Sequence, residues 1–374
     1  MMYLDNAATS FLKPNSVRKA VNVAMIQCAS PGRGGYLPAM EASRKVLQCR
    51  QMAEKLFSCS AEQVVFTSNA THALNVAIRT LVREGDSVVI SGFEHNAVLR
   101  PLTALHANIT VAGRKLFSQE DTLNAFADAI TPQIACVICT HVSNVFGYIL
   151  PVKEIGKLCR ERGVPFVVDA SQSAGILPVS LEDFSADFIA MPGHKGLYGP
   201  QGTGLLLCNR LPNPLLYGGT GSLSANAEMP DFLPDRAEAG TANVPGICGL
   251  MKGMEFVSQM GTERIFHHER NLCKKLYKML CDLGYEQVFF ADDSVQTGVL
   301  SFVPREDCEL CAQRLGERGI AVRAGLHCAP LAHESAGTIE TGTVRLSPSV
   351  FTTTEQLPLL YRLLHEKNPF ELGK

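Results

Sequence analysis

The stretch IACVICTHV (134–142), with VKEIGKLCRERG (152–163) and PFVVDA (165–170) after it, decides the fold class of this chain. The first and third segments are apolar along most of their length, and the middle one has amphipathic helical spacing and ends in Gly163. Strands that are apolar on both faces and are joined by a helix are typical of parallel sheets covered by helices on both sides. We therefore predict an α/β fold.

The same alternation continues on both sides of this stretch. Further strand-like runs are QVVFTSN (63–69), SVVISGFE (87–94), DFIAMPG (187–193) and TGLLLCN (203–209). Several of them are separated by amphipathic stretches, which again favours a parallel sheet. A loop is expected over residues 218–243, which are rich in Gly, Ser, Ala and Pro and show no period.

The pattern changes near residue 250. One long helical pattern covers residues 251–284, and shorter strand and helix signals follow it. We predict a large α/β domain over residues 15–250 and a smaller α+β domain formed by residues 1–14 and 251–374.

Composition narrows the function classes. The chain has 374 residues, 46% of them hydrophobic, and a net charge of −2, which gives no reason to expect nucleic acid or an anionic membrane as partner. The N-terminus lacks a basic region followed by an apolar run, and no apolar stretch approaches the roughly 18 residues of a membrane helix. The 13 cysteines are an odd number without a secretory signal, so we expect reduced thiols and a cytoplasmic protein.

Two CxxC pairs raise the question of a metal site. Cys308 and Cys311 fall in a predicted amphipathic helix, where this spacing arises easily. Cys136 and Cys139 fall in a predicted strand, where they face opposite sides and cannot bind one ion. No Cys/His tetrad can be assembled, so we expect no metal.

Three clusters follow predicted strands, at the sheet edge where open α/β folds bind ligands. TSNATHALN (67–75) joins a strand to a helix, and its free N–H groups with the Thr71 hydroxyl suit a phosphate, although such residues also cap helices. In VVDASQSAG (167–175), Asp169 ends an apolar strand and is either a helix cap or the partner of a protonated ring nitrogen. In AMPGHKGLYGPQGTG (190–204), Lys195 lies in a glycine-rich turn that suits a desolvated amine nucleophile.

Together, the phosphate turn, the Asp-x-x-Gln segment and the His-Lys pair predict a pyridoxal 5'-phosphate site. The chain resembles class V aminotransferase-fold enzymes, and most closely the cysteine desulfurase and selenocysteine lyase branch. The resemblance runs nearly end to end. Its landmarks are YLDNAATS (3–10), EHNA (94–97), HVSNVFG (141–147), GHK (193–195), EAGTAN (238–243) and RLSPSVFTT (345–353). The compact segment RAGLHCAPLAH (323–333) is similar to that of the SufS-like group.

This resemblance implies a fold type I PLP-dependent transferase, with a mostly parallel seven-stranded sheet in its large domain. It also implies roles for individual residues. Lys195 would bind the cofactor's aldehyde and move the Cα proton, Cys328 would take the sulfur, and His95 would stack on the ring.

Further roles follow from the same resemblance. Asp169 would hold the pyridinium and Gln172 the phenolic oxygen. The phosphate would be bound by Ala70, Thr71 and His194, and by Thr241 of the partner subunit in a homodimer. Asn144 and Arg345 would grip the substrate carboxylate, Arg345 by a bidentate pair. Arg323 would assist the cysteine loop or form a structural salt bridge, and His327 is a further candidate beside Cys328.

The sequence departs from the family pattern in the phosphate site. Pro192 and Ala70 stand where hydroxyl residues are common, so we expect either weaker retention of the cofactor or a compensating donor such as Ser68, Asn69 or His72.

The expected function is therefore a PLP-dependent cysteine desulfurase that acts on L-cysteine and passes sulfur to a protein acceptor. Three alternatives stay open: a selenocysteine lyase acting on L-selenocysteine, another class V reaction that leaves Cys328 idle, and a catalytically silent cofactor-binding or sulfur-relay protein.

Overall fold

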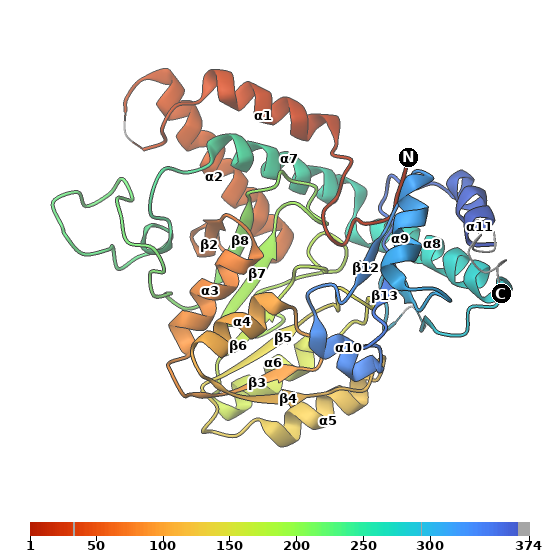
Figure 1. The fold of residues 1–374 in the computed structure, drawn as a ribbon. Coiled ribbons are helices and arrows are strands. Elements are labelled where there is room, and N and C mark those ends of the chain that lie inside the picture. The colour runs from red at the N-terminus through yellow and green to blue at the C-terminus, as the bar shows by residue number, and fades with distance from the viewer. Residues whose placement is uncertain (33, 293, 366–374) are drawn as a thin grey trace.

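The structure is a computed structural model that describes residues 1–32, 34–292 and 294–365 (Figure 1). Its centre is a seven-stranded sheet whose strands, from one edge to the other, are β2 (Val64–Thr67), β8 (Gly204–Cys208), β7 (Phe188–Pro192), β6 (Phe166–Asp169), β5 (Cys136–Thr140), β3 (Ser87–Ser91) and β4 (Asn108–Ala112). Neighbouring strands are parallel except that β8 runs antiparallel to both β2 and β7. The prediction of a mostly parallel sheet is confirmed.

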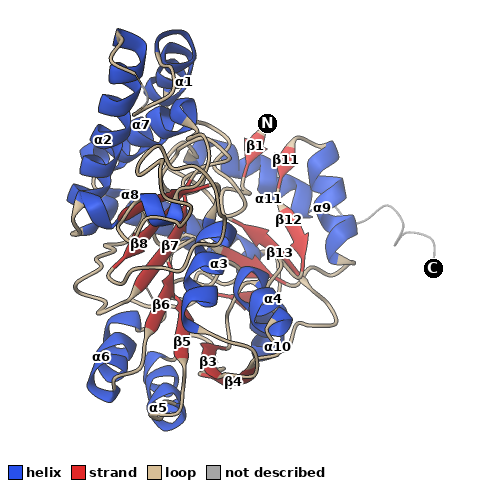
Figure 2. Cartoon of the chain, turned by 90° about the vertical axis from the view of Figure 1, so that its left-hand side faces the viewer, coloured by secondary structure: helices blue, strands red, loops and turns tan. Residues whose placement is uncertain are grey.

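Helices cover both faces of this sheet (Figure 2). One apolar core lies under α3 (Ala70–Leu81) and α4 (Asn96–Ala104). The core on the other face lies under α2 (Leu37–Phe57), α5 (Gln119–Ala129), α6 (Val152–Arg162) and α7 (Val244–Met260). The strands are apolar on both faces because each face is buried against helices.

The alternation of side chains along β5 confirms the prediction for its two cysteines. Cys136 belongs to one core and Cys139 to the other, so their thiols lie on opposite faces of the sheet. Among the residues that the structure describes, no three or more His, Cys, Asp or Glu side chains gather as metal ligands would.

A second, four-stranded antiparallel sheet has the order β12 (Arg323–Gly325), β13 (Thr343–Leu346), β10 (Leu300–Phe302) and β9 (Val288–Phe289). Its core also takes in residues of α8 (Thr262–Asp282), α9 (Cys308–Glu317) and α11 (Leu357–His365). The N-terminal strand β1 (Met2–Tyr3) pairs with β11 (Ile320–Ala321), and Met2 and the following Leu4 belong to this core. Residues 366–374 of the predicted smaller domain lie outside the described residues.

The helical pattern over residues 251–284 is two helices rather than one. Helix α7 begins earlier, at Val244, and ends at Met260, and α8 begins at Thr262. Gly261 between them has a φ of 82°, a conformation that continues no right-handed helix. The predicted single helix is therefore wrong at this one residue.

Two α-helices of the described residues remain. Helix α1 (Asn15–Gln27) packs along α7, and the short helix α10 (Pro330–Ala336) follows the turn that carries Cys328. Ser335 Oγ donates to Gly92 O at 2.9 Å, which fixes α10 to the residue after β3. The Cys328 turn thus lies in the segment between β12 and β13 of the smaller sheet, where that segment meets the larger sheet.

Candidate active site

A cavity of about 200 Å³ lies at the carboxyl ends of β5, β6 and β7. The structure brings ten of the predicted site residues to its wall, namely Ala70, Thr71, His95, Asn144, Asp169, Gln172, His194, Lys195, Arg323 and Arg345. These residues are spread over 276 positions of the sequence (345 − 70 + 1), and the parallel sheet gathers them because its strand ends share one edge.

Asp169 is a buried carboxyl at this edge, with 2% of its surface exposed. Its Oδ1 accepts a hydrogen bond from Ser171 N at 2.9 Å, so it caps a local turn, although no α-helix begins there. Burial raises the pKa of Asp169, while the hydrogen bonds from Ser171 and the charge of Lys195 lower it. A cationic partner in the cavity would offset the cost of this buried charge.

Lys195 lies in the turn after β7 and lines the same cavity. Burial lowers its pKa to about 8, and the charges of Arg345 and Arg323 act in the same direction, while Asp169 opposes them. A lysine with such a pKa is partly neutral near pH 8 and can act as a nucleophile. The turn depends on Gly196, because a Cβ there would lie 2.4 Å from Ala174 O.

His95 caps α4 through its ring. Nδ1 accepts a hydrogen bond from Ala97 N at 3.0 Å, which leaves Nε2 as the protonated nitrogen of the neutral ring. Burial, and the charges of Lys195 and Arg323, lower the pKa of His95 to about 4. The ring is therefore neutral at neutral pH, which suits contact with an aromatic ring better than an imidazolium would.

The N-terminal segment closes one side of the cavity and was not predicted to do so. Gln172 Nε2 donates to Ala7 O at 2.9 Å, and His194 Nδ1 lies 3.0 Å from Thr9 Oγ1. Lys13 Nζ donates to His194 O at 3.0 Å, and burial lowers the pKa of Lys13 to about 8. The segment YLDNAATS (3–10) was part of the family resemblance, but only the structure shows which residues it contacts.

The proposed phosphate turn is the start of α3. Asn69 Oδ1 accepts from His72 N at 2.9 Å and caps the helix, and Ala70 and Thr71 line the cavity. Of the three compensating donors, only Asn69 lies on the cavity wall. The Ser68 and His72 side chains contact each other at 3.3 Å and line a different cavity.

Arg345 is 1% exposed, and its guanidinium already has partners. Nη2 pairs with Asp5 Oδ1 at 2.6 Å, and Nη1 donates to Asn144 O at 3.0 Å. Its Nε and the Asn144 Oδ1 are buried without a hydrogen-bond partner among the described residues. Buried polar atoms of this kind call for an explanation, and a bound polar ligand supplies one. Asp5 is a site residue that the sequence pattern did not reveal.

Cys328 is exposed, and Arg323 Nη2 lies 3.5 Å from its Sγ. The neighbouring His327 turns inward and is buried, so it does not face the thiol. Cys281 is the other exposed cysteine in the described part of the chain, and it lies on α8. Both His327 and Cys328 have positive φ, a conformation that costs on the order of 1–3 kcal/mol for each non-glycine residue.

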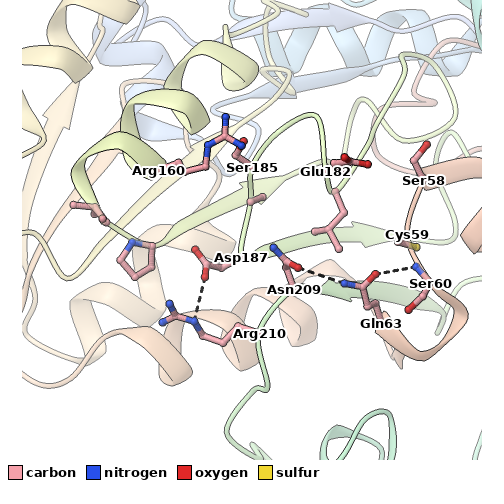
Figure 3. A pocket seen from close by; sticks show the side chains of 15 residues that line it. Ser58, Cys59, Ser60, Gln63, Arg160, Glu182, Ser185, Asp187, Asn209 and Arg210 are labelled. Atoms are coloured by element: carbon pink, nitrogen blue, oxygen red, sulfur yellow. Dashed lines mark hydrogen bonds and ion pairs between the residues drawn. The ribbon is translucent and has the colours of Figure 1, made fainter.

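Two larger cavities lie elsewhere. Thr241 lines one of about 650 Å³, with Gly202 and Gly240, and does not line the active-site cavity of its own chain. The other, of about 780 Å³, lies at the opposite edge of the sheet around Asp187 and Arg210 (Figure 3). It contains none of the predicted site residues, so the cavity with the larger volume is not the candidate active site. No helix in the described part of the chain has the length and apolar character needed to cross a membrane.

Comparisons with known proteins identify the family of the chain. Residues 2–360 match the family aminotransferase class-V. A probable cysteine desulfurase of Methanothermobacter thermautotrophicus is 34% identical, over 98% of this chain and 94% of its own length. Another probable cysteine desulfurase, from Pyrococcus abyssi, is 32% identical over 98% of this chain and 94% of its own length.

Solved structures extend the likeness to the fold. The apo structure of cysteine desulfurase from Thermococcus onnurineus NA1 superposes with a TM-score of 0.89 at 31% identity, covering 97% of this chain and 94% of the other. The cysteine desulfurase CsdA from Escherichia coli gives a TM-score of 0.82 at 25% identity, covering 97% and 93%. The match spans nearly the whole chain in sequence and in structure, and the chain belongs to the aminotransferase class-V family.

Proposed function

We propose that this protein is a pyridoxal 5'-phosphate-dependent cysteine desulfurase, which converts L-cysteine to L-alanine and takes the sulfur onto Cys328. One observation supports the proposal most strongly. A desolvated lysine and a buried carboxylate face one cavity, and an exposed thiol lies beside an arginine that lines the same cavity. A reaction of the same family without sulfur transfer would need no thiol there.

The residues present fit the cofactor. Lys195 supplies an amine of lowered pKa for the aldehyde, and Asp169 supplies the buried carboxylate that a protonated pyridine nitrogen needs. The start of α3 offers N–H groups to a phosphate, and neutral His95 lines the same cavity. When bound, the cofactor supplies an electron sink that labilises the substrate's Cα proton and weakens its Cβ–S bond.

The remaining steps belong to residues of the chain. Arg345 and Asn144 bind the substrate carboxylate, and the orphaned Arg345 Nε is an available donor. Because Asp5 occupies Nη2, a bidentate grip on the substrate requires Arg345 to share or release Asp5. Lys195 would remove the proton from Cα and return one to the product.

Sulfur transfer completes the reaction. The Cys328 thiolate attacks the substrate sulfur, the Cβ–S bond breaks, and an S–S bond forms on Cys328. The bonding pair stays on the carbon side and is protonated, so L-cysteine and one thiol give L-alanine and one persulfide. The attack needs a thiolate, and Arg323 Nη2 lies 3.5 Å from Sγ.

The wider setting is proposed with the function. We propose a cytoplasmic homodimer in which Thr241 reaches the partner's phosphate site, and a protein acceptor that takes the sulfur from Cys328. We also propose that residues 15–250 and residues 1–14 with 251–374 form the two domains.

The test is reconstitution with the cofactor. The wild type should become yellow and release alanine from L-cysteine under reductant, and Lys195→Ala should lose the covalently bound cofactor and the activity. Comparing L-cysteine with L-selenocysteine in wild type and Cys328→Ala separates a desulfurase from a selenocysteine lyase. A wild type that stays colourless after reconstitution contradicts the proposal.

A further inference from the structure

The turn that carries Cys328 has a strained backbone. Ala329 N donates to Leu326 O at 2.9 Å, which closes a reverse turn with His327 and Cys328 at its centre. Their φ angles are 52° and 57°, both in the left-handed region. Turns with two left-handed central residues favour Gly, Asn and Asp, because other side chains are strained there. Such a conformation persists only where neighbouring groups hold it.

Two hydrogen bonds hold the backbone of this turn. Asn144 Nδ2 donates to His327 O at 2.8 Å, and Asn96 N donates to Cys328 O at 2.7 Å. Both donors come from the segments that follow strands of the large sheet. They fix the two carbonyl groups and leave the direction of the His327 side chain to other contacts.

The His327 ring belongs to a buried chain of hydrogen bonds. Its Nε2 lies 3.3 Å from Arg323 O, and its Nδ1 lies 3.4 Å from His333 Nε2. His333 Nδ1 in turn lies 2.8 Å from Thr338 Oγ1. The chain of contacts therefore runs from the loop after α10 to the strand that carries Arg323.

The groups at the two ends of this hydrogen-bond chain determine which atom donates in each bond. A carbonyl oxygen only accepts, so His327 Nε2 carries a proton, and Nδ1 of the neutral ring accepts one from His333 Nε2. His333 Nδ1 then accepts from the Thr338 hydroxyl. All four ring nitrogens are satisfied with both rings neutral.

Burial stabilises this neutral arrangement. The His327 and His333 residues are 2% and 0% exposed, and their ring planes are within 8° of parallel. Burial, with the charge of Arg345, lowers the pKa of His327 to about 2, and burial lowers the pKa of His333 to about 4. Removing either donor would leave a buried nitrogen unsatisfied.

We propose that His333 is a positioning residue for sulfur transfer, acting through His327 to hold the strained turn so that Cys328 Sγ stays beside Arg323. The proposal rests on the desulfurase function proposed above. Arg323 links the histidine chain to the thiol, because its carbonyl oxygen lies 3.3 Å from His327 Nε2 and its guanidinium contacts Cys328 Sγ. His333 does not line the active-site cavity, so its effect must pass through the turn.

A matched pair of substitutions tests this. The amide nitrogen of Gln at position 333 can take the place of Nε2 and donate to His327, whereas the shorter Asn can replace only Nδ1. His333→Gln should therefore keep the turn and His333→Asn should release it. Thermal unfolding of both variants shows whether each is folded.

Two readouts separate positioning from general stability. In the apo protein, iodoacetamide labelling of Cys328 is measured against the exposed Cys281 by peptide mass spectrometry. In the holoenzyme, exchange of the substrate Cα proton with D₂O is measured against alanine formation. For His333→Asn we expect the relative labelling of Cys328 to differ from that of the wild type and alanine formation to fall on the order of tenfold, with proton exchange retained. His333→Gln should recover both.

The proposal is overturned if His333→Asn labels Cys328 and forms alanine at the wild-type rates, or if exchange and alanine formation fall together. A wild type that makes no alanine contradicts the proposed function instead, and the labelling ratio in the apo protein still decides whether His333 holds the turn.

Discussion

The ion pair between Arg345 and Asp5 should contribute measurably to the free energy of unfolding. The Arg345 side chain is 1% exposed and that of Asp5 is 20% exposed, with Nη2 and Oδ1 2.6 Å apart. Removing one partner of a buried pair typically costs about 3–5 kcal/mol, because the other charge is left uncompensated. In Asp5→Asn the amide oxygen still accepts from Arg345, and water reaches this side of the pair. We therefore expect a loss of about 2 kcal/mol in the free energy of unfolding, or about 2–3 °C in Tm for a chain of 374 residues.

The assay is urea unfolding of the apo protein, with Asp183→Asn as the control. Asp183 pairs with Lys153 at 3.7 Å on an exposed surface, so its substitution should change the free energy by less than about 0.5 kcal/mol. L-Alanine, the proposed product, brings a carboxylate to Arg345. In the cofactor-loaded protein it should therefore narrow the gap between Asp5→Asn and wild type. An Asp5→Asn protein as stable as the wild type would refute the reasoning.

Three further predictions concern the lysine turn and its surroundings. The rate of cofactor uptake by the apo protein should rise with pH through about 8 and then level off, because only the neutral Lys195 amine attacks the aldehyde. Stopped-flow absorbance at a series of pH values measures this rate. A rate that is independent of pH between 7 and 9 contradicts the prediction. In Asp169→Asn the midpoint of that pH profile should move lower, because the Asp169 charge raises the pKa of Lys195; an unmoved midpoint would mean that the two groups do not interact. Gly196→Ala should lower the free energy of unfolding in urea by about 1–3 kcal/mol and weaken cofactor retention, because the added Cβ meets a backbone oxygen. Gly316→Ala on α9 places its Cβ in free space and should be neutral or stabilising. Equal stability of the two variants would contradict this prediction.

The sheet could be predicted because its central strands are apolar on both faces. β5, β6, β7 and β8 are buried along their whole length, so each is a continuous apolar run. β4 does not stand out in the sequence because it is an edge strand, and most of its residues are partly exposed. The break at Gly261 between α7 and α8 leaves the hydrophobic period intact, so only the backbone shows it.

The site could be predicted where residues follow strands. Asp169 and Lys195 stand directly at or after strand ends, and Lys195 has the lowered pKa that its glycine-rich turn led us to expect. Asp5 could not be assigned, because its partner is 340 residues away and no local pattern links them. The inward direction of His327 depends on a positive φ, which adjacency to Cys328 does not reveal.

The central claim is that Cys328 takes sulfur from L-cysteine. Its most direct test is mass spectrometry of the Cys328 peptide after a single turnover of the cofactor-loaded protein, without reductant. We predict one added sulfur atom on Cys328, an equal amount of L-alanine, and no added sulfur on the exposed Cys281. Alanine formed at the wild-type rate by Cys328→Ala, or a wild-type Cys328 that gains no sulfur, would contradict the claim.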